Sequence, residues 1–110
     1  MIHNKCVKAS FALGSKYNES MRDIEQLSAT EFADMMHIKK FEELRYNAGK
    51  SFMDLVYGIE DYEKACEIKI NKDILKDFSN TLKEIKTIRN VNQKTLMTKW
   101  SNLANILLPK

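Results

Sequence analysis

A chain of 110 residues is the usual size of one domain, so we expect a single helical domain over residues 1–110. Its 44% hydrophobic residues are enough for a core, and a charged fraction of 30% is ordinary for a folded protein. Three Gly and one Pro are too few for a loop-rich or all-β protein, because turns depend on these residues. We therefore predict an all-α fold, a compact bundle of about five amphipathic helices.

The charge is distributed unevenly along the chain. Residues 1–55 carry eight basic and eight acidic side chains, whereas residues 85–110 carry five basic side chains and no acidic one. The net charge of +3 is weak. A basic end of this kind can bind a nucleic acid, an acidic protein or an anionic membrane.

The compartment is predicted from the cysteines and the amino terminus. Cys6 and Cys66 are too few for a disulfide framework and lie on separate apolar stripes, so we expect both to be reduced and metal-free. Lys5 and Lys8 interrupt the segment that a signal peptide would need to be apolar. No uncharged run approaches the 18 or more residues that cross a bilayer. These features predict a cytoplasmic protein without membrane contact.

The amino-terminal quarter has apolar and small residues at alternating steps of four and three. This spacing favours one helix from about residue 4 to 27 over two shorter helices separated at Gly14. The recurring positions are Cys6, Ser10, Leu13, Tyr17, Ser20, Ile24 and Leu27. Ser28, with Glu31 three residues later, has the spacing of a capping box and predicts the start of the next helix.

The pattern over residues 29–48 is less regular, and its phase slips near His37. Two interpretations are open: one helix with a wide buried face, or two helices that meet at a tight turn. Residues 47–49 then predict a helix end, because Gly49 can adopt the left-handed conformation that terminates helices.

Three further amphipathic helices are predicted, over residues 51–70, 72–90 and 94–108. Ser51 would cap the first, and Pro109 would stop the last. The apolar side of the middle helix consists of Ile74, Phe78, Leu82, Ile85 and Ile88. The last helix places Leu96, Trp100, Leu103 and Leu107 on one side, with Trp100 as a core anchor.

A row of lysines along residues 72–90 is the most informative candidate site. At 100° per residue, Lys72, Lys76 and Lys83 fall within about 40° of one another, opposite the apolar side. Such a row can follow a phosphate backbone or an acidic protein, although solvated helix faces also carry lysines. The complete predicted basic set is Lys72, Lys76, Lys83, Lys86, Arg89, Lys94 and Lys99.

We therefore predict a non-enzymatic binding module, a small subunit or inhibitor in a larger assembly. Its basic carboxyl-terminal region would contact nucleic-acid backbone or an acidic protein partner. The sequence shows no catalytic constellation, metal motif or cofactor motif, so an enzyme with a site assembled from scattered residues ranks third.

The second-ranked hypothesis is a DNA-binding regulator, because residues 30–46 partly resemble a helix-turn-helix. The side chains that would contact DNA are Lys39, Lys40 and Arg45. This hypothesis ranks lower because His37 stands where the turn favours Gly, and Glu43 stands where the second helix buries an apolar residue.

Overall fold

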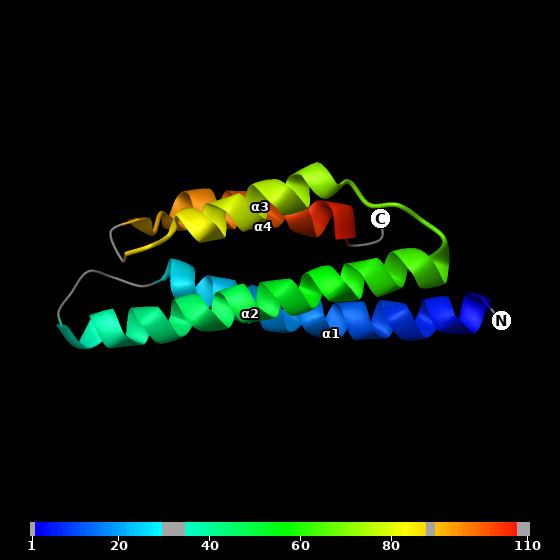
Figure 1. Cartoon of the computed structure of the whole chain (residues 1–110), viewed down its shortest axis with the longest axis horizontal. Helices are drawn as coiled ribbons and strands as arrows, with labels where there is room; N and C mark the ends of the chain where they lie inside the picture. The colour runs from blue at the N-terminus through cyan, green and yellow to red at the C-terminus, as the bar shows by residue number, and fades with distance from the viewer. Residues whose placement is uncertain (1, 30–34, 88–89, 108–110) are drawn as a thin grey trace.

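The chain folds into antiparallel helices that form two layers (Figure 1). The structure, a computed structural model, describes residues 2–29, 35–87 and 90–107, and the side chains of residues 4–29, 40–87 and 90–107. Within these ranges there are four helices and no strand, which confirms the all-α prediction and corrects the expected number of about five. Their bounds are α1 Ile2–Ser28, α2 Met35–Cys66, α3 Lys72–Glu84 and α4 Gln93–Leu107.

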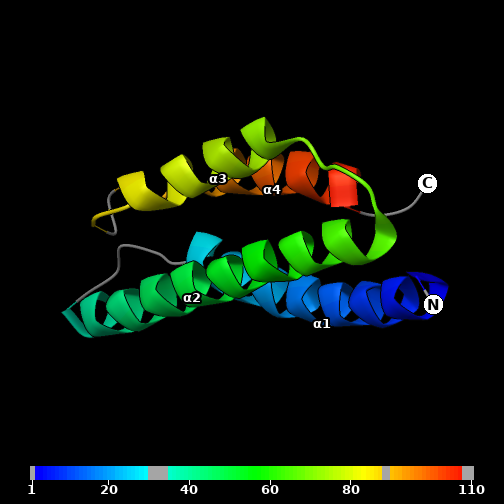
Figure 2. The ribbon, with the colours of Figure 1, turned by 45° about the vertical axis from the view of Figure 1, so that its right-hand side comes forward.

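The bundle is long and narrow, with extents of 54 × 21 × 20 Å. Helices α1 and α2 form one antiparallel layer, and α3 and α4 form a second, shorter layer above it (Figure 2). Helices α1 and α2 pack along their length, α4 packs on α1, and α3 packs on α4. The fourth edge, between α2 and α3, is more open than these three.

Helix α1 is continuous through Gly14, as the spacing predicted. Its buried side, which includes Leu13, Ile24 and Leu27, faces the core. The capping-box prediction at Ser28 is wrong, because Ser28 is the last residue of α1 and its Oγ donates a hydrogen bond to the Glu25 carbonyl at 2.9 Å. Glu31 lies outside the described residues.

Helix α2 runs without a break through residues 47–51, where we expected one helix to end and another to begin. Ser51 is buried inside the helix, and its Oγ donates to the Ala48 carbonyl at 3.3 Å instead of capping a new start. A glycine inside a helix costs about 1 kcal/mol, and the buried side chains on either side of Gly49 outweigh that cost. This buried row comprises Phe41, Leu44, Ala48, Phe52, Leu55 and Ile59. The fusion of two expected helices into α2 accounts for the difference in number.

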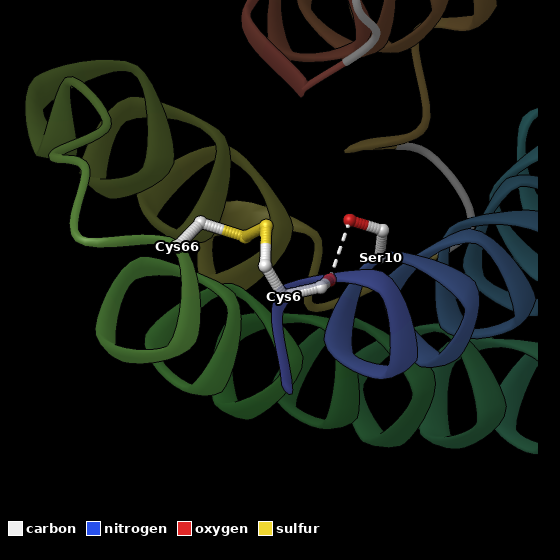
Figure 3. The surroundings of a disulfide bond; sticks show 3 residues. All are labelled: Cys6, Ser10 and Cys66. Atoms are coloured by element: carbon white, nitrogen blue, oxygen red, sulfur yellow. Dashed lines mark hydrogen bonds between the residues drawn. A yellow bond between two sulfur atoms is a disulfide. The ribbon is translucent and has the colours of Figure 1, made fainter. Parts of the chain in front are cut away.

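A disulfide joins Cys6 to Cys66, with their Cα atoms 4.7 Å apart (Figure 3). The prediction of two reduced thiols is therefore wrong. Because α1 and α2 are antiparallel, the end of α2 returns to the start of α1, and cysteines 60 residues apart become neighbours. Beside the bridge, the Ser10 Oγ donates to the Cys6 carbonyl at 2.8 Å. Disulfides persist in oxidising compartments, so the argument from free thiols to a cytoplasmic location no longer holds.

Helix α3 is shorter than the predicted 72–90 and begins at a cap. The Asn71 Oδ1 accepts a hydrogen bond from the Asp73 N–H at 2.9 Å, and the helix ends before Ile85. Its buried side also differs from the prediction: Leu75 and Thr81 are buried, whereas Ile74 and Leu82 are only partly buried. Phe78 and Ile85 are buried as expected, and Ile88 lies outside the described residues.

Helix α4 confirms the predicted apolar side, since Leu96, Trp100, Leu103 and Leu107 are all buried. A row of aromatic rings connects the two layers. Ring centroids are 5.3 Å apart for Tyr17 and Trp100, 5.5 Å for Trp100 and Phe78, and 5.1 Å for Phe78 and Phe52. Pro109 lies outside the described residues. Among the described helices, none contains a stretch that is both long enough and apolar enough to cross a membrane.

Candidate partner-binding groove

Three of the predicted lysines line one groove between α2 and α3. Lys72, Lys76 and Lys83 lie at helical spacing on α3, with Ser79 between them. The groove has a volume of about 350 Å³. Its α2 wall is made of Phe52, Met53, Val56, Ile59 and Glu60, and Leu75 completes the α3 wall.

The lysines lie on the side of α3 away from the buried Phe78 and Thr81, and they reach the groove beside Leu75, at the edge of the buried side. At 100° per residue, the centre of the buried residues Leu75, Phe78 and Thr81 lies about 140° from the mean direction of the lysines. At 100° per residue, Leu75 lies about 60° from the line of Lys72, so one turn presents a cation and an apolar group together.

The groove is shallow, with an apolar floor and a wall that is partly open to solvent. Phe52, Ile59 and Leu75 are buried and form the floor. Met53 is 45% exposed, and Val56 is half-buried beside it. The exposed wall can therefore cover one or two apolar side chains of a partner, while the floor is already packed.

The rim is electrically positive on the α3 side. Lys76 and Lys83 make no ion pair within the described part of the chain, and both are exposed. Glu60 is the acidic residue that lines the α2 side. An acidic group placed in the groove would therefore meet lysines along α3 at short range, where screening by salt is weakest.

Glu63 fixes the connection between α2 and α3. One carboxylate oxygen accepts a hydrogen bond from the Ile70 N–H at 2.9 Å, and the other accepts one from the Lys72 Nζ. The hydrogen bond from Lys72 is the largest cause that holds the pKa of Glu63 below its ordinary value, and the bond from Ile70 is the next largest. Burial of the carboxylate opposes this shift. Lys72 therefore stabilises the connection between α2 and α3 in addition to lining the groove.

The chain leaves α2 through a helix-terminating turn just beyond this carboxylate. Glu67 has a φ of 54°, in the left-handed region, and the Ile68 N–H donates to the Glu63 carbonyl at 3.1 Å. This is the bond pattern of a Schellman motif, with Glu67 at the position where Gly is usual.

The other predicted basic residues do not line the groove. The Lys99 Nζ donates to Asp77 at 3.2 Å and to the Thr81 Oγ at 2.8 Å, so it ties α4 to α3. Lys86 follows α3, Lys94 lies in the first turn of α4, and both are exposed. Arg89 lies outside the described residues.

The predicted helix-turn-helix lacks its turn. Helix α2 is continuous from Met35, so the backbone at His37 is helical where the motif needs a turn. The Lys40 Nζ lies 3.8 Å from the Glu43 Oε2, and the Arg45 Nη1 lies 3.8 Å from the Glu42 Oε2. Both cations therefore have an acidic neighbour. Residues 30–34 and the side chain of Lys39 are not described.

Sequence reasoning missed the α2 half of the groove. Met53, Val56 and Glu60 follow one another at steps of three and four, so periodicity alone could have grouped them. Which helix faces that side depends on tertiary packing, which the sequence pattern does not contain. No local motif marks Glu63 in the sequence, although its carboxylate bonds to the residues that lead into α3.

No protein-family model, curated protein or solved structure matches this chain. Among the described residues, no group of three or more His, Cys, Asp or Glu side chains is arranged to hold a metal ion.

Proposed function

We propose that this chain is a non-enzymatic binding module, a small subunit or inhibitor of a larger assembly, that holds an acidic protein segment in the groove between α2 and α3. The observation that supports this most is the lysine row of α3 beside an apolar wall. An amphipathic segment with acidic and apolar residues on adjoining sides matches both features.

The composition of the groove favours a protein over a nucleic acid. A phosphate backbone needs cations but has no group that fills an apolar wall such as Met53 and Val56. Bases bind by stacking on exposed aromatic or Arg planes, and Phe52, the aromatic residue of the lining, is buried.

The test compares defined probes by fluorescence anisotropy. The first probe is a helical peptide of about 12 residues with glutamates and leucines on adjoining sides, which spans about 18 Å, close to the length of α3. The others are a polyglutamate peptide of equal charge and a single-stranded oligonucleotide. We expect the amphipathic peptide to bind most tightly, with an affinity that falls as salt rises.

A matched pair of variants assigns the binding to the groove. Lys76→Glu with Lys83→Glu should weaken peptide binding at least tenfold, while circular dichroism and melting stay close to wild type. Lys5→Glu with Lys8→Glu makes the same change in net charge on an exposed part of α1 and should leave the affinity unchanged. Equal losses in both variants, tighter binding of the oligonucleotide, or no binding of the amphipathic peptide would contradict the proposal.

A further inference from the structure

The outward face of α2 carries a regular row of exposed residues beside the groove. Tyr46, Met53 and Tyr57 are 68%, 45% and 56% exposed, and Lys50, Glu60 and Lys64 continue the row. The steps from residue 46 to 64 are four, three, four, three and four. This is the heptad spacing by which one helix packs along another, and we name these six residues the α2 seam.

The α2 seam contains an open socket. A surface hollow of about 600 Å³ is lined by residues that include Tyr46, Gly49, Lys50 and Met53. A Cβ atom at Gly49 would meet no other atom within 4 Å, so the space above this glycine is free. Four residues at this spacing form the hole into which a side chain of a facing helix inserts. Tyr57, one turn beyond Met53, is a side chain of the kind that fills such a hole.

We propose that the occupant of the α2 seam is a second copy of this chain, with the two α2 helices antiparallel about a two-fold axis at Met53. Met53 then faces Met53 of the second copy, and Tyr57 enters the socket above Gly49. Symmetry repeats this contact, because a two-fold interface uses the same surface twice.

The charges of the seam agree with this arrangement. Lys50 lies beside Tyr57 of the second copy, where a cation contacts an aromatic ring. Glu60 lies opposite Tyr46, whose hydroxyl can donate to the carboxylate. Lys64, in the last turn of α2, lies opposite the acidic Glu42, which also lines the hollow.

The same charges disfavour a parallel pair. In a parallel arrangement each residue faces its own copy, so Lys50, Glu60 and Lys64 would each meet a like charge. Like charges that face each other across a helix pair destabilise it, whereas the antiparallel register removes all three repulsions. Half of the seam is charged, so the pair forms reversibly and depends on concentration.

Sedimentation equilibrium from about 1 µM to about 1 mM tests the pairing. The mass of the wild-type chain should rise toward that of a dimer across this range. Met53→Glu places two carboxylates on the two-fold axis and should raise the dissociation constant at least tenfold. Phe11→Glu changes a residue of α1 that is 77% exposed and lies outside the seam, so its dimer should match wild type.

Cross-linking tests the register. Met53→Cys should form an intermolecular disulfide much faster than Phe11→Cys, although the Phe11 site is more exposed. A chain that stays monomeric near 1 mM, a Met53→Glu variant that associates like wild type, or equal cross-linking of the two cysteine variants would overturn the proposal.

The evidence for this pairing is separate from that for the groove, although Met53 and Glu60 belong to both surfaces. Lys76 and Lys83 lie on α3, outside the α2 seam, so their replacement by Glu should leave the dimer unchanged. If those substitutions abolished dimerisation, the surface between the copies would include the lysine row of α3 and the seam assignment would be wrong.

Discussion

Trp100 connects three helices through ring contacts. Its ring stacks on Tyr17 of α1 and lies against Phe78 of α3, and the residue is only 3% exposed. Trp100→Ala should therefore cost about 3–5 kcal/mol, the usual loss for emptying a buried aromatic site. Chemical denaturation measures this as a lower unfolding midpoint.

Trp100→Phe provides the matched comparison. The indole Nε1 is buried without a hydrogen-bond partner, so this substitution keeps a ring in the core and removes an unsatisfied donor. It should cost much less than Trp100→Ala. Equal costs would mean that the ring contacts contribute little, and a loss below about 1 kcal/mol for Trp100→Ala would place the residue outside the core.

Glu63 makes stability depend on pH. Its pKa in the folded chain lies below the ordinary value of 4.5, chiefly because Lys72 donates a hydrogen bond to the carboxylate. The stabilisation is therefore complete above the pKa of the unfolded chain and is lost as the pH falls through the lower folded pKa. Glu63→Gln should lower the urea midpoint at pH 7, and its difference from wild type should shrink below about pH 4.

Glu19→Gln serves as the control for this measurement, because Glu19 of α1 is exposed and makes no ion pair within the described residues. Its midpoint should follow wild type at both pH values. If the urea midpoint of Glu63→Gln stays equally far below that of wild type at about pH 3, the substitution destabilises the fold through lost packing and not through lost charge.

At the scale of elements, the disulfide joins the start of α1 to the end of α2. The chain itself connects these two helices only at their opposite ends. The bridge spans 60 residues, and a loop of that length restricts the unfolded chain by about 4 kcal/mol on the chain-entropy estimate. The double variant Cys6→Ser and Cys66→Ser should keep its helical circular dichroism and lose about this much unfolding free energy. Reduction of the wild type should produce the same loss, and an unchanged midpoint after reduction would contradict the estimate.

The elements that could be predicted from sequence are those set by a single helix. The spacing that defined α1, and the apolar side of α4 around Trp100, depend only on residues three and four apart. The helix end predicted at Gly49 and Ser51 does not occur. The free energy that these residues gain from ending a helix is smaller than the free energy gained by burying their neighbours. The Cys6–Cys66 bridge and the α2 wall of the groove depend on which helices meet, and no local spacing encodes that.

At the scale of the whole molecule, the four edges of the bundle are unequal. Three helix pairs pack closely, whereas α2 and α3 pack less closely and are connected by the rings of Phe52 and Phe78, whose centroids lie 5.1 Å apart. The proposed binding surface therefore lies at the least closed edge of the bundle. The proposed pairing surface lies on the adjoining face of α2, and Met53 and Glu60 belong to both surfaces.

This inequality predicts where the bundle opens first. Helices α1 and α2 pack along their length and share a covalent bridge, whereas α3 packs on α4 and borders the groove. Local opening needs less free energy where fewer buried contacts must be broken. Amide hydrogen exchange followed by mass spectrometry should therefore show faster exchange over Leu75–Lys83 than over Leu44–Ile59. Reduction of the disulfide should accelerate exchange near Cys66 while leaving this order intact, and protection of α3 equal to that of α2 would show that the open edge does not weaken the fold.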